Sequence, residues 1–252
     1  MNQLPRIALI GGTGVGDKFA AMPGRIVHVP TNYGMIRAKI APHEGCELVL
    51  LQRHSSGHKV PPHRVNYQGM TQALKALNVK GCIATAAVGS LREDWEPGTF
   101  VVCSDFLDYT YRRLTMWDRE VKHIDFSNPF DPALRSALLE TAKSLNEPIQ
   151  NGGVYIGGDG PRYESPHEIQ VLARDGDLVG MTASSETILM RELGIPYSLL
   201  AIVTNLGCGL GTGELNHEEV VDVMQERGKS IFAILLGATT SFAKNKTQAA
   251  QK

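Results

Sequence analysis

The chain has 252 residues, of which 42% are hydrophobic and 20% charged, and its formal net charge is −1. This length and composition suit one globular domain with a sizeable core. The balanced charge argues against a nucleic-acid binder, which usually carries a basic excess or stripe. The first apolar run stops at Gly11, too early for a signal peptide or a membrane span. We therefore expect neither a nucleic-acid nor a membrane partner.

Short apolar runs alternate with helical patterns, which predicts an α/β fold: a single-domain, largely parallel but mixed β-sheet flanked by helices. In chain order, the predicted strands are residues 7–10, 26–29, 35–40, 47–51, 81–86, 99–103, 153–156, 178–181 and 197–203. The predicted helices are residues 65–77, 132–145, 166–173 and 185–193, and one long last helix from Asn216 to Leu236. We place the domain at residues 1–242 and expect the polar segment 243–252 to fray.

Four widely scattered cysteines form no CxxC pair: Cys46, Cys82, Cys103 and Cys208. This spacing argues against a disulfide scaffold and a zinc ribbon, and it favours a reducing, cytoplasmic setting.

The glycine-rich segment 11–16 follows the first predicted strand. A dinucleotide fold would need an uninterrupted helix next and an acidic residue about 20 positions on, but residues 22–24 are Met-Pro-Gly and no Asp or Glu lies between Asp17 and Glu44. A P-loop would need a lysine where Asp17 stands. What remains is a turn with the Thr13 hydroxyl and free backbone N–H groups, which is either an anion site or a structural turn.

Arg53 and His54 follow the predicted strand 47–51, at the edge where open α/β sheets bind ligands. A guanidinium fork suits a phosphate dianion and the imidazole adds a second donor, although a solvated loop pair is the alternative. Further on, His58 and His63 bracket two prolines that forbid the helix needed to align them. We therefore predict no metal site.

Two further loops carry candidate ligand-binding side chains. In residues 158–166, Tyr163 offers an aromatic face for a base, and Glu164 offers an acceptor for a ring N–H or a charge at a helix N-terminus. Asn205 follows an apolar strand and enters the glycine-rich residues 206–213, so it either caps the loop or contacts a ligand.

Seven motifs in order resemble the trimeric purine nucleoside phosphorylase and methylthioadenosine phosphorylase family over nearly the whole chain. They are Gly-Gly-Thr-Gly at 11–14, Arg-His at 53–54, Val-Asn-Tyr at 65–67, Gly-Ser-Leu-Arg-Glu at 89–93, Gly-Pro-Arg-Tyr-Glu at 160–164, Gly-Met-Thr at 180–182 and Asn-His-Glu-Glu-Val at 216–220. The segment 123–127, His-Ile-Asp-Phe-Ser, further resembles the methylthioinosine phosphorylase branch.

This resemblance implies a nucleoside phosphorylase-like fold, a homotrimer with shared active sites, and inorganic phosphate as co-substrate without a cofactor. The implied phosphate-binding residues are Thr13, Arg53, His54 and Thr182, with backbone near Ala86. The implied purine- and ribose-binding residues are Val88, Gly89, Tyr163, Glu164, Met181, Asn205, His217 and, from a neighbouring subunit, His123. Of these, Asn205, Glu164, Thr13 and His54 form the expected catalytic set.

Two departures from the family pattern bear on the substrate. Ala86 stands where relatives often have a hydroxyl or amide, so one phosphate or ribose contact is in doubt. Adenine-cleaving relatives carry two aspartates where this chain has Asn205 and Gly207, which favours a 6-oxopurine: methylthioinosine, inosine or guanosine.

Several alternatives stay open. A methylthioadenosine phosphorylase is the alternative substrate class, and a non-catalytic nucleoside or phosphate binder is the alternative protein class. A hydrolytic nucleosidase fits poorly with Arg53 and His54. His217 favours a 5′-hydroxyl, whereas the segment around His123 favours a 5′-methylthio group.

Overall fold

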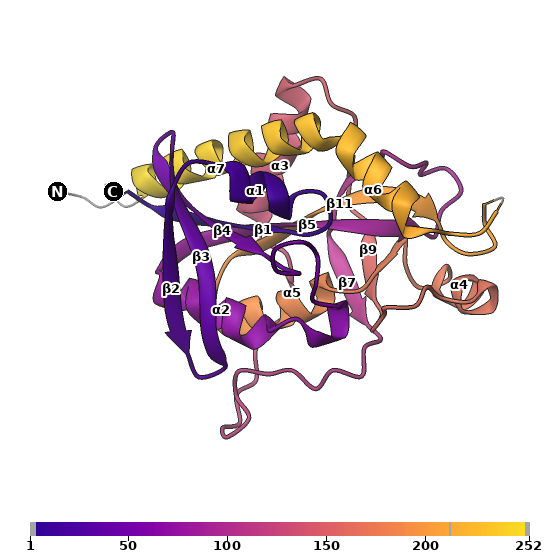
Figure 1. The fold of residues 1–252 in the computed structure, drawn as a ribbon, viewed down its shortest axis with the longest axis horizontal. Helices are drawn as coiled ribbons and strands as arrows, with labels where there is room; N and C mark the ends of the chain where they lie inside the picture. Colours follow the sequence, from indigo (N-terminus) through magenta and orange to yellow (C-terminus); the bar gives the residue numbers. More distant parts are fainter. Residues whose placement is uncertain (1–3, 212, 250–252) are drawn as a thin grey trace.

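Strand β5 (Val79–Ser90) is the branch point of the sheet because it pairs with three other strands. It runs parallel to β1 (Arg6–Gly11) and β11 (Tyr197–Leu206), and its last residues pair antiparallel with β10 (Leu178–Gly180). The computed structural model describes residues 4–211 and 213–249. The predicted mixed sheet flanked by helices is confirmed (Figure 1).

From one edge, the strand order is β2-β3-β4-β1-β5-β10-β9-β7, and β11, β6 and β8 branch from β5. The remaining strands are β2 (Arg25–Thr31), β3 (Gly34–His43), β4 (Cys46–Gln52), β6 (Phe100–Val102), β7 (Asp105–Asp108), β8 (Ile149–Asn151) and β9 (Val154–Gly157). Strand β1 runs parallel to β4 and to β5, and β5 runs parallel to β11. The carboxyl ends of these four strands therefore lie at the same edge of the sheet.

Helices cover both faces of the sheet (Figure 1). One face carries α1 (Gly16–Ala21), α3 (Pro132–Ser144) and α7 (Gly228–Ala249), whose apolar side chains join a cluster around Leu9. The other face carries α2 (Tyr67–Ala76) and α5 (Ala183–Glu192), packed around Ile10. Three shorter elements complete the fold: the 3₁₀ turn Pro62–Arg64, α4 (Pro166–Leu172) and α6 (His217–Glu226). Within the described residues, no helix is both long and apolar enough to cross a bilayer.

The prediction of one long last helix is wrong. Helix α6 ends at Glu226 and α7 begins at Gly228, with Arg227, whose backbone stays in the αR region, as the C-cap between them. The Arg227 guanidinium lies 4.3 Å from the centre of the Phe100 ring and donates to Glu147, and these contacts hold the junction of the two helices. Helix α7 then continues to Ala249, past the start of the segment expected to fray, because Phe242 and Ala243 are buried against the sheet. Residues 250–252 of that segment lie outside the described residues.

Most strands run further than their apolar runs predict, and two of these extensions, at the ends of β5 and β11, reach the candidate site residues Gly89 and Asn205. Strand β5 continues to Ser90 and β11 to Leu206, and Asn205 pairs with Gly89 after a register shift in β11. Gly89 and Asn205 are therefore positioned by strand pairing and not by a loop. The short elements α1, β7 and β8 are also absent from the sequence prediction, because they are too short to show a period.

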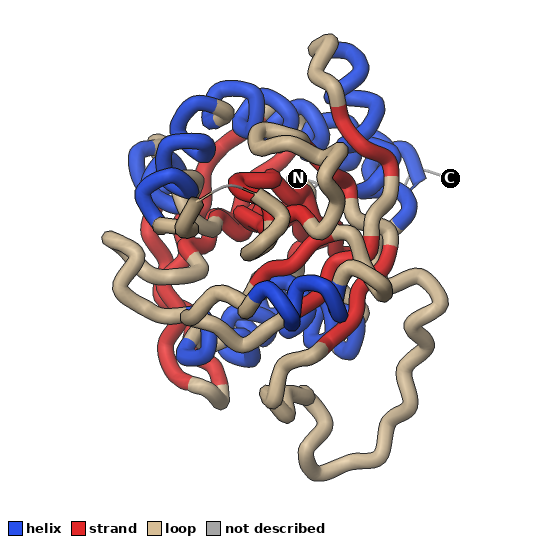
Figure 2. Tube along the Cα trace, turned by 90° about the vertical axis from the view of Figure 1, so that its right-hand side faces the viewer, coloured by secondary structure: helices blue, strands red, loops and turns tan. Residues whose placement is uncertain are grey.

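A long loop, residues 109–131, connects β7 to α3 and extends away from the body (Figure 2). Arg112 anchors its base, donating to the Ser185 hydroxyl at 3.0 Å and to the Asp159 carbonyl oxygen at 2.7 Å. Further along, Tyr111 is 92% and Val121 is 87% exposed.

Candidate active site

A cavity of about 410 Å³ opens at the carboxyl ends of β1, β4, β5 and β11. Every site residue predicted from the sequence lines it except His123. The predicted residues it brings together are Thr13, Arg53, His54, Ala86, Val88, Gly89, Tyr163, Glu164, Met181, Thr182, Asn205 and His217. His123 is exposed in the long loop, and its expected contact with a neighbouring subunit stays a prediction.

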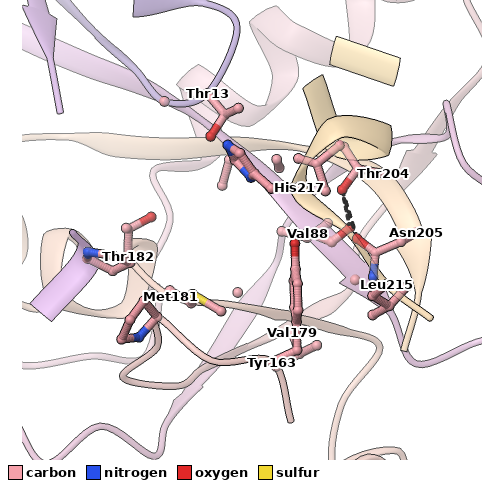
Figure 3. Close-up of a pocket in the computed structure, with 18 of the residues that line it drawn as sticks. Thr13, Val88, Tyr163, Val179, Met181, Thr182, Thr204, Asn205, Leu215 and His217 are labelled. Atoms are coloured by element: carbon pink, nitrogen blue, oxygen red, sulfur yellow. Dashed lines mark hydrogen bonds between the residues drawn. The ribbon is translucent and has the colours of Figure 1, made fainter. Parts of the chain in front are cut away.

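Two ends of the cavity are separated in Figure 3. Thr182 lies on one side and Asn205 on the other, with Met181 and Tyr163 between them. We call the side with Thr13, Arg53, His54 and Thr182 the anion end, and the side with Tyr163, Glu164 and Asn205 the base end.

Arg53 is held at the anion end by a buried ion pair. Its Nε and Nη2 donate to the Glu186 carboxylate at 2.5 and 2.8 Å, and its Nη1 donates to the Thr85 carbonyl oxygen at 2.8 Å. Burial by itself lowers the pKa of Arg53, but the Glu186 charge outweighs it and raises the pKa above its ordinary value. The side of the guanidinium formed by Nε and Nη2 therefore faces Glu186 and not a phosphate. The second hydrogens of Nη1 and Nη2 are the ones available to a ligand.

Gly12 shows how closely this guanidinium approaches the glycine turn. A Cβ on Gly12 would lie 2.6 Å from Arg53 Nη1, so a side chain at this position would displace the arginine. The need for glycine here comes from this contact and not from a dinucleotide.

Glu186 is the main functional residue that the sequence interpretation misses. It lies in the first turn of α5, its side chain is 2% exposed, and it also accepts a 2.8 Å hydrogen bond from the Tyr197 hydroxyl. The available signal is its position one turn after Thr182, among small residues that leave a helix face free to pack.

The surroundings of His54 favour a neutral imidazole with its hydrogen on Nδ1. Its Nδ1 lies 2.8 Å from the Val60 carbonyl oxygen, which can only accept, so Nδ1 carries the hydrogen. Burial and the Arg53 charge lower the pKa of His54 to about 3. The expectation that this ring adds a second donor does not hold for such a tautomer, because its other nitrogen is an acceptor.

At the base end, the Asn205 carboxamide has a defined orientation. Its Nδ2 donates to the Leu206 carbonyl oxygen at 2.9 Å, and its Oδ1 accepts from the Thr204 hydroxyl at 3.0 Å (Figure 3). Because a carbonyl cannot donate, the NH₂ group must stay on the Leu206 side. One N–H and one lone pair remain for a ligand.

Glu164 is the second polar group of the base end. It follows β9 in the loop that leads to α4, and burial raises the pKa of its carboxyl. A Cβ on Gly158 would lie 3.0 Å from Glu164 Oε1, so the loop folds closely around this carboxylate.

Three imidazoles follow one another along one wall, with their rings tilted relative to one another. The His54 and His58 rings are 4.2 Å apart, and the His58 and His217 rings 5.5 Å apart. Within residues 4–211 and 213–249, no group of three or more His, Cys, Asp or Glu side chains is placed to hold a metal ion. Besides His58, the lining residues outside the predicted site set are Gly12, Lys59, Pro61, Pro62, Ala87, Pro161, Val179, Gly180, Thr204, Gly207, Cys208, Leu215 and Val220.

Fold and cavity together define a small-molecule enzyme of the α/β class, with an anion and an aromatic heterocycle as the ligands its two ends suit. The chain matches the family described as "Phosphorylase superfamily" over residues 6–240. It therefore belongs to this superfamily, and the family expected from the seven motifs is confirmed.

Relatives of known name cover nearly the whole chain. It is 41% identical over 238 residues to a probable 6-oxopurine nucleoside phosphorylase of Moorella thermoacetica, covering 92% of each chain. It is 38% identical over 226 residues to a probable S-methyl-5′-thioinosine phosphorylase of Methanopyrus kandleri, covering 88% of this chain and 87% of the relative. The structure of methylthioadenosine phosphorylase from Schistosoma mansoni in complex with adenine matches with a TM-score of 0.86 at 27% identity, covering 96% of each chain.

Proposed function

We propose that this enzyme cleaves a purine nucleoside with inorganic phosphate, yielding the free base and ribose 1-phosphate or its 5-methylthio derivative. Methylthioinosine, inosine and guanosine are the favoured substrates. The observation that carries the proposal is the convergence of the anion end and the base end on one cavity. The names of the relatives support the same reaction class.

The proposed reaction uses positioning and charge stabilisation without a metal or organic cofactor. The bond between C1′ and the purine nitrogen breaks with its electron pair going to the base, and a phosphate oxygen bonds to C1′. The hydrogen brought by monohydrogen phosphate equals the one that the released base needs, so the reaction balances. Positive charge grows at the sugar beside the bound dianion, and hydrogen bonds at the base end strengthen as the purine leaves.

The base end supports a preference for 6-oxopurines. The free N–H of Asn205 suits O6, and its Oδ1 suits a protonated N7. Glu164 suits the N1–H of the same base. Adenine offers a lone pair at N1 and a donor at C6, so both side chains would be mismatched, at a cost of roughly 1–3 kcal/mol each.

The 5′ side of the substrate depends on His217, the first residue of α6. An imidazole can hydrogen-bond a hydroxyl, whereas a thioether prefers an apolar wall. We expect His217→Ala to reduce kcat/KM for inosine more than for methylthioinosine. An equal reduction for both would leave His217 as a helix-start residue only and would favour the methylthio substrate.

The assembly and setting that we propose are a cytoplasmic homotrimer with shared active sites. Exposed apolar side chains in the long loop, such as Tyr111 and Val121, support contact with a second subunit. The four free thiols, of which Cys46, Cys82 and Cys103 are buried, support a reducing compartment.

Release of base from inosine, guanosine, methylthioinosine and methylthioadenosine, with and without phosphate, tests the proposed function. We expect release from the 6-oxopurine nucleosides to collapse in phosphate-free buffer, and Arg53→Ala to raise the phosphate requirement. Equal turnover without phosphate would identify a nucleosidase, a preference for methylthioadenosine would select the alternative phosphorylase, and binding without turnover would select the non-catalytic binder.

A further inference from the structure

His54 is fixed at the anion end by two hydrogen bonds to one residue. Its ring Nδ1 donates to the Val60 carbonyl oxygen at 2.8 Å, and its own backbone carbonyl accepts from the Val60 N–H at 3.0 Å. This reciprocal pair sets the direction of the ring and uses its only hydrogen. Among the described residues, Nε2 has no hydrogen-bond partner, and the side chain lines the cavity.

The groups around this ring oppose a positive charge on it. His54 is 7% exposed and Arg53 precedes it in the chain. The centre of the His58 ring lies 4.2 Å from that of the His54 ring, and His217 lies beyond His58. The carboxylate of Glu186 is paired with Arg53 and does not contact His54. The charge of Asp17 acts on His58, where it opposes the lowering of the pKa by burial. The pKa of His54 is accordingly lowered to about 3 by burial and by Arg53, and Nε2 presents a lone pair at neutral pH.

We propose that Nε2 of His54 accepts the hydrogen of monohydrogen phosphate, so that the anion end selects an oxyanion that brings its own proton. This inference rests on the proposed phosphate site. The remaining N–H groups of Arg53 can only donate, and the hydroxyls of Thr13 and Thr182 can donate as well as accept, so these groups suit the three unprotonated oxygens. Nε2 of His54 is the one atom of this set that can only accept, and it matches the single P–OH group.

Sulfate has the same shape and the same charge as monohydrogen phosphate but carries no hydrogen at neutral pH. A bare sulfate oxygen would face the Nε2 lone pair, and this contact becomes attractive only after His54 takes up a proton. Sulfate binding is therefore coupled to the uptake of one proton, whereas binding of monohydrogen phosphate is not.

Calorimetric titration of the whole protein with sulfate or phosphate, in buffers of different ionisation enthalpy, counts the protons taken up. We expect sulfate to bind with net proton uptake, and the sulfate Kd to rise with pH from about pH 5 upward, by up to about tenfold per pH unit where one whole proton is bound per anion. The phosphate Kd should stay flat above about pH 8, where the dianion dominates. A flat sulfate Kd without proton uptake would overturn the proposal.

A glutamine at position 54 can present an N–H where Nε2 presents a lone pair. His54→Gln should make the sulfate Kd independent of pH and reduce the preference for phosphate over sulfate at about pH 8 by tenfold or more. The matched control is His63→Gln, an exposed residue outside the cavity lining, which should behave as wild type. An unchanged sulfate profile in His54→Gln contradicts the proposal, and the proton count on wild type decides it if that variant fails to fold. If the wild-type protein does not bind phosphate at all, the proposed function itself is wrong.

Discussion

The pair of Arg53 and Glu186 is the most buried charge interaction at the site, with side chains 1% and 2% exposed. Removing one partner from a buried ion pair leaves the other charge uncompensated, which typically costs about 3–5 kcal/mol of stability. The pair therefore holds the arginine in place while leaving part of its hydrogen-bonding capacity to a ligand.

We expect Glu186→Gln to lower the melting temperature markedly, and added phosphate to raise that temperature more in the variant than in wild type. The reason is that a bound anion takes over the neutralisation of Arg53. Thermal unfolding with and without phosphate measures both effects. Tyr197→Phe is the control, since it removes only the 2.8 Å hydrogen bond to Glu186 and should cost about 1 kcal/mol. A variant as stable as wild type would contradict this account of the pair.

Asn205 allows a second prediction at the residue scale. In Asn205→Asp, an oxygen replaces the Nδ2 atom that now lies 2.9 Å from the Leu206 carbonyl oxygen, so two acceptors meet. We expect kcat/KM for methylthioinosine to fall about tenfold or more, and the ratio of methylthioadenosine to methylthioinosine turnover to rise.

The repulsion between these two oxygens also raises the pKa of the new carboxyl. Lowering the pH protonates it, and a carboxylic acid can donate as the amide did, so activity with methylthioinosine should partly recover in acid. Asn205→Ala, which has no proton to gain, should show no such recovery. Identical pH profiles for the two variants would mean that this side chain does not contact the base.

Most of the lining residues are predictable because polar side chains follow apolar strands at one edge of a parallel sheet. Two features are not predictable in this way. Glu186 resembles an ordinary solvent-facing helix residue until Arg53 is brought to it from 133 positions earlier in the chain. The tautomer of His54 depends on a backbone carbonyl six positions further on, which only the folded loop places beside the ring.

At the scale of elements, helix α4 holds the loop of the base end. The Ser165 hydroxyl accepts from the Glu168 N–H at 3.2 Å, and the Glu168 carboxylate accepts from the Ser165 N–H at 2.7 Å, which forms a capping box. Arg162 donates twice to the same carboxylate, both at 2.8 Å. Tyr163 and Glu164 lie between these two anchors.

Ser165→Ala should therefore raise the KM for the nucleoside several-fold and leave the KM for phosphate unchanged, with a stability loss of about 1 kcal/mol. Steady-state kinetics with each substrate varied in turn measures the difference. Asp131→Ala removes the N-cap of α3, whose carboxylate accepts from Leu134 N–H at 2.9 Å, and it should cost similar stability without changing either KM. Parallel changes in both KM values after Ser165→Ala would assign the effect to general loosening.

The order and type of the main elements follow from periodicity, but two boundaries do not. A glycine within a helical pattern is often tolerated, so Gly228 does not reveal that α6 and α7 are separate. At the junction, Arg227 contacts Phe100 and Glu147, two residues distant in sequence. Likewise, the ends of β5 and β11 extend because they pair with each other, which a single run of residues does not encode.

At the scale of the whole molecule, the long loop with His123 leads to a prediction about active sites shared between subunits. If His123 completes a neighbour's cavity, then mixed trimers of His123→Ala and Asn205→Ala subunits should contain intact sites, although each variant alone has none. Random assembly from equal amounts should restore about a quarter of the sites. Co-expression followed by activity measurement tests this, and sedimentation gives the oligomeric state.

Mixing Asn205→Ala with Glu164→Ala is the matched control. Both of these residues line the cavity of their own chain, so every site stays defective and no activity should return. Restored activity in the control would mean that subunits exchange more than the long loop. A fully active monomer would remove the shared site altogether.

The long strand β5 runs past both ends of the cavity, with Ala86 among the phosphate-binding candidates and Gly89 among the purine-binding ones. Three residues of extended strand span about 10 Å at roughly 3.3 Å per residue. The backbone of β5 therefore fixes the distance between the anion end and the base end of the cavity. Side-chain replacements can change which base or anion is held, but the length of the molecule that fits between them is set by the backbone itself.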